Sequence, residues 1–119
     1  MVIEAIRNAS TDSKGRWLFD ASHTDARAEW ALTTCEEHQL EKRVIDRTFV
    51  DREGTRWIVD FKTGDHKGGD LEGFLTSEVE RYGPQLRRYA EILCNFESKP
   101  VKLALYFPLL QAFRVVSST

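Results

Sequence analysis

The sequence predicts a mixed α/β (α+β) fold, with a central mixed sheet that contains an antiparallel hairpin and is flanked by helices. Three observations predict it. The apolar runs 43–50 and 56–62 are separated by Asp51-Arg52-Glu53-Gly54, a usual length for a hairpin loop. Apolar residues recur at three- and four-residue steps within 74–96, as on one face of a helix. The continuous apolar run 101–107 is typical of a buried strand.

The segments before the hairpin give weaker patterns. Apolar residues at helical spacing in 1–7 indicate the end of a helix. Residues 15–19 fit a short strand or an apolar plug, and the polar segment 20–25 fits a loop. Residues 26–34 end in strand-favouring side chains, so we expect a strand that leads into the hairpin.

After the hairpin, residues 63–69 are rich in Gly, Asp and Lys and predict an exposed loop, which could also face a substrate. Because proline is favourable in the first turn of a helix and disruptive inside one, we expect the main helix to start near Gly83 or Pro84. Residues 111–116 can add an edge strand. The expected order is helix, strand, hairpin, helix, strand.

Length and composition indicate one domain over residues 1–119, with 41% hydrophobic and 30% charged residues, as in ordinary globular proteins. The net charge of -2 argues against holding nucleic acid by bulk electrostatics. The two cysteines, Cys35 and Cys94, exclude a metal site built from cysteines alone. The chain has no signal-peptide pattern and no apolar run long enough for a membrane span, so we expect a cytoplasmic protein without a membrane partner.

Asp46, Asp60 and Lys62 are the candidate catalytic residues. Asp60 and Lys62 are two positions apart in a predicted strand, so their side chains project from the same face. Asp46 joins them only if paired residue numbers in the hairpin have an even sum, as when Val50 lies opposite Arg56. Pairing of Val50 with Thr55 would turn Asp46 away.

Two aspartates on one face suit a hard divalent cation. Mg²⁺ takes oxygen ligands and often only one or two protein carboxylates, which leaves positions for water and a substrate phosphate. A cation there can activate water, and a lysine beside it can stabilise negative charge on phosphoryl oxygens. The chemistry predicted is phosphodiester hydrolysis.

Three segments carry a resemblance to a known family: Val44-Ile45-Asp46-Arg47, then Trp57-Ile58-Val59-Asp60-Phe61-Lys62-Thr63-Gly64, then Gln85-Leu86-Arg87-Arg88-Tyr89-Ala90. Over residues 15–113 the chain resembles the PD-(D/E)xK nuclease superfamily, specifically the RecB-like nuclease domain at the C-terminus of UvrD/Rep-type helicase-nucleases. The resemblance implies a restriction-endonuclease-like core. It also implies a fragment of a larger helicase-nuclease, active as a DNA exonuclease in repair and recombination.

The resemblance also implies roles for single residues. Asp46 and Asp60 would bind Mg²⁺ or Mn²⁺, with the Phe61 carbonyl as a further ligand, and Lys62 would be the catalytic lysine. Gln85 and Tyr89, four apart on one helix face, would contact DNA or support the site. The implied partners are DNA, expected to be single-stranded, and helicase domains of the parent chain or complex.

Other interpretations stand beside these. Glu29 is similar to the family's acidic residue on the first strand, with a metal contact left open. The family's upstream histidine has no counterpart in residues 1–8, which keeps open a second function: a catalytically incomplete nuclease-fold module that binds DNA or a helicase. The aspartates could also be ordinary surface carboxylates, Lys62 could simply end a strand, and Tyr89 could be a core aromatic residue.

Overall fold

The computed structural model describes residues 13–36, 39–64, 66 and 68–117; the helix end predicted over residues 1–7 lies outside them. The elements, in chain order, are α2 (Ser13–Leu18), β1 (Thr24–Glu36), β2 (Gln39–Val50), β3 (Arg56–Phe61), α3 (Leu71–Cys94), β4 (Val101–Phe107), the 3₁₀ turn η1 (Pro108–Leu110) and β5 (Ala112–Val116). This mixed sheet with helices confirms the α/β class, and from β1 onward the elements follow the predicted order of strand, hairpin, helix and strand.

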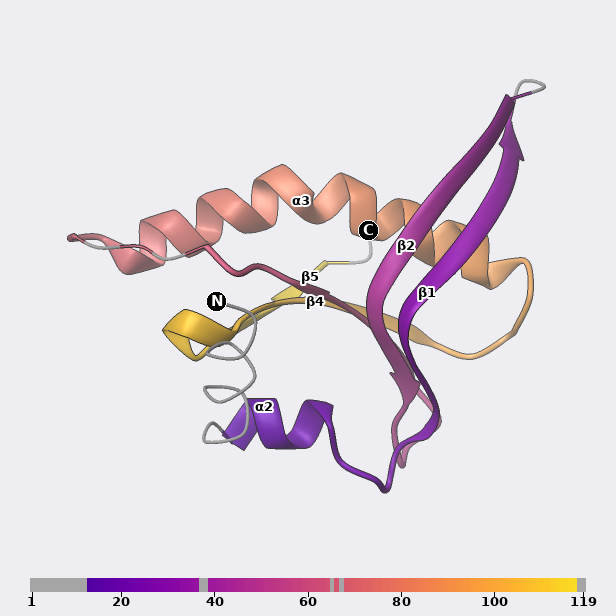
Figure 1. Ribbon diagram of the computed structural model, residues 1–119, viewed down its shortest axis with the longest axis horizontal. Helices are drawn as coiled ribbons and strands as arrows, with labels where there is room; N and C mark the ends of the chain where they lie inside the picture. Colours follow the sequence, from indigo (N-terminus) through magenta and orange to yellow (C-terminus); the bar gives the residue numbers. More distant parts are fainter. Residues whose placement is uncertain (1–12, 37–38, 65, 67, 118–119) are drawn as a thin grey trace.

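The five strands lie in the order β1-β2-β3-β4-β5. Neighbours are antiparallel except β3 and β4, which are parallel and are connected by α3. Figure 1 shows three layers, with α3 on one side of the sheet and α2 on the other, while the β1–β2 ribbon extends beyond the remaining strands. The strands predicted over 26–34 and 101–107 are present, and β5 is the edge strand expected near 111–116.

Each face of the sheet has its own apolar cluster. On the α3 side, Ile58, Leu103 and Leu105 pack against helix residues such as Leu86 and Leu93. On the α2 side, Leu18 is fully buried in a second cluster, whose members are Leu18, Phe49, Trp57, Val59, Ala104 and Tyr106. Because successive strand residues point to opposite faces, β3 contributes Ile58 to one cluster and Trp57 and Val59 to the other.

The strand interpretation of residues 15–19 is wrong, because Ser13–Leu18 form the short helix α2. The alternative of an apolar plug describes this segment better. Leu18 is 0% exposed, and Trp17 makes edge-on contacts with Phe49 and Trp57. In so short a segment, three consecutive apolar residues do not distinguish a strand from a single buried helical turn.

The expected start of the main helix near Gly83 or Pro84 is also wrong. Helix α3 starts at Leu71, where the Asp70 side chain accepts a hydrogen bond from Gly73 N, and it continues through Pro84. Proline inside a helix costs about 3 kcal/mol or more. Leu75 is buried a full two turns before Pro84 and Leu86 is buried just after it, so continuous packing against the sheet offsets that cost.

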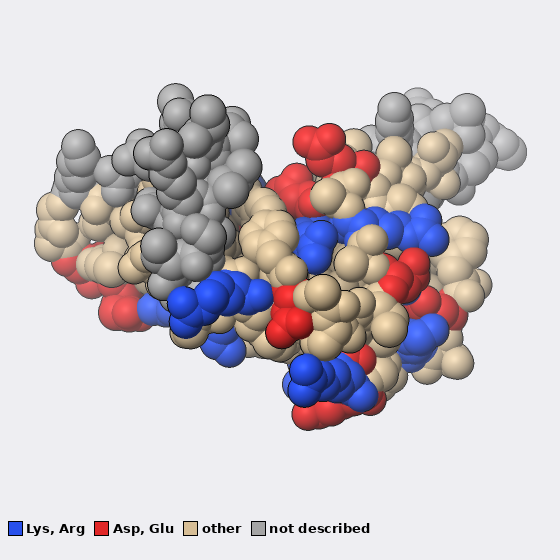
Figure 2. Space-filling model, turned by 60° about the horizontal axis from the view of Figure 1, so that its bottom comes forward, with Lys and Arg blue, Asp and Glu red and all other residues tan. Residues whose placement is uncertain are grey.

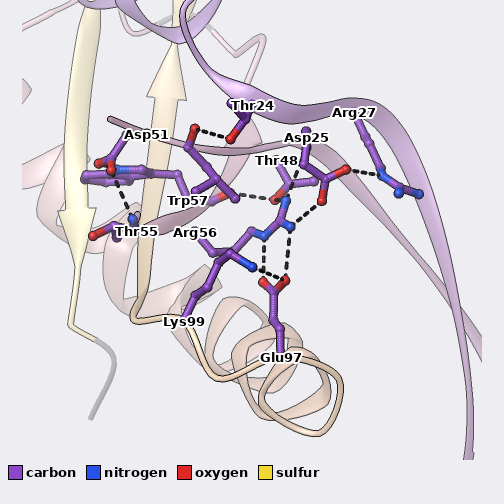
Figure 3. A network of polar contacts seen from close by, with 11 residues as sticks. Thr24, Asp25, Arg27, Thr48, Asp51, Thr55, Arg56, Trp57, Glu97 and Lys99 are labelled. Atoms are coloured by element: carbon purple, nitrogen blue, oxygen red, sulfur yellow. Dashed lines mark hydrogen bonds and ion pairs between the residues drawn. The ribbon is translucent and has the colours of Figure 1, made fainter. Parts of the chain in front are cut away.

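A buried arginine connects the ends of several elements (Figure 3). Arg56, the first residue of β3, is 1% exposed. Its guanidinium donates to Glu97 Oε1 at 2.7 Å and is ion-paired with Asp25 in β1. It also donates to Thr48 Oγ1 at 3.3 Å. We call Arg56, Asp25 and Glu97 the arginine cluster; it fixes β3 against β1 and the segment after α3.

Within the described part of the chain, no helix combines the length and the apolar character that a bilayer crossing requires.

Candidate active site

The hairpin register brings the two predicted aspartates to the same face. Val50 lies opposite Arg56 and Arg47 opposite Val59, so paired numbers have an even sum, and the register the sequence analysis required is confirmed. Continued by one residue, this register sets Asp46 across from Asp60. The two carboxyl groups are close enough to hydrogen-bond to each other. We call Asp46 and Asp60 the aspartate pair.

The Asp46 carboxyl is in an unfavourable place for a negative charge. Partial burial and the neighbouring Asp60 carboxyl raise the pKa of Asp46 to about 6, against the lowering effects of the Phe61 N–H and Lys62. The Phe61 N–H donates to Asp46 Oδ2 at 2.9 Å. This bond orients Asp46, but it does not cancel the cost of placing a second carboxylate beside Asp60.

The Lys62 ammonium lies next to the pair. Its Nζ is 2.8 Å from Asp60 Oδ2, and the two side chains are 22% and 14% exposed. The same Nζ lies 3.3 Å from the ring centroid of Tyr82 in α3. The Lys62 ammonium is therefore the cation beside both carboxyl groups, and it contacts Asp60 directly.

The donor set fits a hard divalent cation. Mg²⁺ and Mn²⁺ prefer carboxylate oxygen and accept one or two protein carboxylates. A cation between Asp46 and Asp60 would offset the repulsion that, in addition to burial, raises the pKa of Asp46. Among the described residues, no third His, Cys, Asp or Glu joins them in a group able to hold a metal.

Gln85 and Tyr89 lie on one face of α3 and are hydrogen-bonded to each other, and Tyr89 is also bonded to β2. Gln85 Nε2 donates to the Tyr89 hydroxyl at 2.9 Å, and this hydroxyl donates to the Val44 carbonyl at 3.2 Å. Tyr89 is only 3% exposed. This burial argues against direct DNA contact by Tyr89, and the bond to Val44, two residues before Asp46, agrees with support of the site.

The remaining two candidates are Phe61 and Glu29. Phe61 turns its ring toward the α2 side of the sheet and presents its N–H to Asp46. Its carbonyl as a metal ligand stays a prediction. Glu29 is exposed and has a left-handed backbone with φ of 50°. The pairs Ala28–Arg47 and Trp30–Ile45 set Glu29 across from Asp46, yet it does not join the aspartate pair in a metal-holding group among the described residues.

Sequence reasoning missed Tyr82, the aromatic partner of Lys62. The expected helix started after Tyr82, so this residue was not assigned to the helix face that packs against the sheet. A helix beginning at Leu71 puts Tyr82 one turn before Leu86 and two turns before Tyr89, on the side that packs against the sheet. The useful signal would have been the apolar stripe, which continues before Pro84 with Leu75 and Val79.

Charges on the molecular surface are mixed. On the face shown in Figure 2, outside the grey atoms, Lys and Arg alternate with Asp and Glu and form no broad basic band. This agrees with the net charge of -2.

In comparisons with known proteins, no family model matches the chain and no curated protein does. The case for a function therefore depends on the geometry of the site and on the motifs that carry the resemblance.

Proposed function

We propose that the chain is a Mg²⁺-dependent deoxyribonuclease domain of the restriction-endonuclease-like type, which hydrolyses phosphodiester bonds. The observation that carries this proposal is the convergence of the aspartate pair and the Lys62 ammonium on one face of the sheet. Within it, the finer assignment is an exonuclease on single-stranded DNA, part of a helicase-nuclease in repair and recombination.

Each residue has a defined task in this proposal. Asp46 and Asp60 would hold Mg²⁺ or Mn²⁺, with the Phe61 carbonyl as a possible third oxygen. The ion, when bound, supplies positive charge that polarises the phosphate and lowers the pKa of an attacking water. Asp46 releases its proton before it can act as a ligand, and the Phe61 N–H keeps its carboxylate turned toward Asp60.

Lys62 has a different task, which is to stabilise charge on the substrate. Its ammonium is next to Asp60 and partly exposed, so a phosphoryl oxygen can approach it from solvent. Negative charge increases on those oxygens in the transition state, and a fixed cation there lowers the barrier more than it strengthens substrate binding.

The test is cleavage of labelled DNA by the purified chain with Mg²⁺, Mn²⁺ or EDTA. We expect metal-dependent degradation of linear single strands, persistence of circular single strands, and loss of cleavage in Asp60→Ala and Lys62→Ala. Asp20→Ala and Lys102→Ala, exposed residues of the same types outside the site, are the matched controls and should cleave normally. Equal cleavage by all five proteins would indicate a contaminant and remove the enzyme assignment, and cleaved circles would replace exonuclease with endonuclease.

A second candidate is a nuclease-fold module that binds DNA or a helicase partner without cutting. It is favoured by the absence of a third metal-ligating side chain beside the pair among the described residues. This module would bind a fluorescent single-stranded oligonucleotide in an anisotropy titration and leave it intact in Mg²⁺ and Mn²⁺. Binding without cleavage would select it over the nuclease.

A further inference from the structure

The Lys62 ammonium has two partners of different kinds. One is the Asp60 carboxylate, at 2.8 Å, and the other is the face of the Tyr82 ring, 3.3 Å from Nζ to the ring centroid. An aromatic face attracts a cation through its quadrupole, and it carries no net charge. Tyr82 therefore holds the ammonium without acting as a ligand for a metal ion.

The two partners respond differently to a divalent cation at the aspartate pair. A cation on Asp60 shares the negative charge that holds Lys62 and repels the ammonium. The attraction of the Tyr82 ring for Nζ is unchanged, because the ring is not a ligand for Mg²⁺. With the metal bound, the ring is the partner that keeps Nζ beside the site.

The backbone that carries Tyr82 is well fixed. Tyr82 packs against the apolar cluster under α3, and its neighbour Gly83 is buried. Leu86, one turn further along, is 1% exposed. A ring on so firmly packed a helix can set the position of a flexible lysine side chain.

We propose that Tyr82 is a positioning residue of the active site, whose ring face holds the Lys62 ammonium beside the aspartate pair while a divalent cation occupies Asp60. This rests on the proposed nuclease function. It assigns to α3 a task different from that of Tyr89, which is bonded to β2, and of Gln85, which is bonded to Tyr89.

The experiment compares Tyr82→Phe with Tyr82→Leu and Tyr82→Met, and it has one readout that needs no activity. In protein labelled with ¹³C at the lysine ε carbon, the Lys62 signal, assigned with Lys62→Arg, should show an upfield ring-current shift. This shift should persist in Mg²⁺ and in Tyr82→Phe, and it should disappear in either folded non-aromatic variant. Arg81→Gln is the control, since Arg81 also lies near this ring, with Cζ 5.2 Å from its centroid, and it should leave the Lys62 signal in place.

The second readout is kinetic. We expect kcat to fall about tenfold in Tyr82→Leu and Tyr82→Met, with KM and Mn²⁺ affinity unchanged, and to be restored in Tyr82→Phe. An unshifted Lys62 signal in the wild type, loss of the shift on addition of Mg²⁺, or equal kcat values in all variants would overturn the assignment of Tyr82. Failure of the nuclease proposal is distinguishable, because the wild type would then show the ring-current shift and no metal-dependent cleavage.

Discussion

Strand β3 has a charged cluster at each end, and the two clusters differ in the cations that face their two acids. These cations are Arg56, Arg27 and Lys99 at its start and Lys62 at its end. At its start, the Arg56 guanidinium bonds to two carboxylates, so that each acid of the arginine cluster has a positive partner. At its end, the aspartate pair shares a single ammonium, which contacts Asp60. One cluster is neutralised by cations within the protein, and at the other, where Lys62 is the cation beside two carboxyl groups, we propose that an external cation binds.

The two clusters also respond to pH in opposite directions. Hydrogen bonds from Arg56 hold the pKa values of Asp25 and Glu97 below their ordinary range, so the arginine cluster loses stability as acid protonates those groups. The pKa of Asp46 is raised to about 6, so the folded state binds that proton more tightly than the unfolded state does. The aspartate pair therefore lowers stability as pH rises from about 4 to above 6. The arginine cluster therefore stabilises the fold at neutral pH, and the aspartate pair destabilises it there.

The largest expected effect separates the clusters by activity. Lys62→Ala should lower kcat by about 10²- to 10³-fold, because it removes the cation that we propose stabilises transition-state charge. Its effect on the unfolding free energy should be smaller than that of losing Arg56, since the Lys62 side chain is 22% exposed and that of Arg56 is 2% exposed. Glu97→Gln should lower the free energy of unfolding and leave cleavage by the folded fraction normal. Nuclease assays and urea unfolding of both variants measure this, and a loss of cleavage in both would mean that the two clusters are not separate.

The second prediction tests the arginine cluster. Arg56→Met should lower the free energy of unfolding by about 3 kcal/mol, because it removes the buried cation shared by Asp25 and Glu97 and leaves them only the more exposed Arg27 and Lys99. Urea unfolding at pH 7 measures it. Arg27→Met, which removes an arginine whose side chain is 51% exposed, is the matched control and should cost less than about 1 kcal/mol. Equal stabilities of Arg56→Met and the wild type would show that β3 does not need this cluster.

The smallest expected effect is a gain in stability at the aspartate pair. Asp46→Asn keeps an acceptor for the Phe61 N–H and removes the charge beside Asp60, as protonation does. At pH 8 it should raise the free energy of unfolding by about 1 kcal/mol, a figure reduced from the full pKa shift because Asp46 is only partly buried. At pH 4, where Asp46 is already protonated in the folded wild type, the gain should disappear. A gain that is the same at both pH values would contradict the proposed cause.

The parts of the fold that follow from residue patterns were predictable. The parity of the hairpin register follows from the apolar residues of β2 and β3, since a shift by one residue would expose them. The start of α3 was not predictable from Pro84, because the burial of Leu75 in the core outweighs the local cost of proline. Residues 15–19 were misassigned because a short apolar run fits a strand and a buried helical turn equally well.

The site was predictable where its members are close in sequence. Asp60 and Lys62 share a strand face, and Asp46 reaches them through one tight turn. The arginine cluster was not predicted because its members are 31 and 41 residues apart and meet only through tertiary contacts. A usable signal was present, since an arginine on the same face as the buried Ile58 requires acidic partners.

The most direct test of the central claim, that the aspartate pair binds a divalent cation, is a calorimetric titration of the chain with Mn²⁺. At pH 7.5 we predict one bound ion per wild-type chain, at least tenfold weaker binding by Asp46→Asn and by Asp60→Asn, and normal binding by Asp20→Asn. Because the ion has to displace the proton on Asp46, wild-type affinity should fall as pH is lowered through about 6. Binding of equal strength in Asp46→Asn, or no binding by the wild type at pH 7.5, would contradict the account.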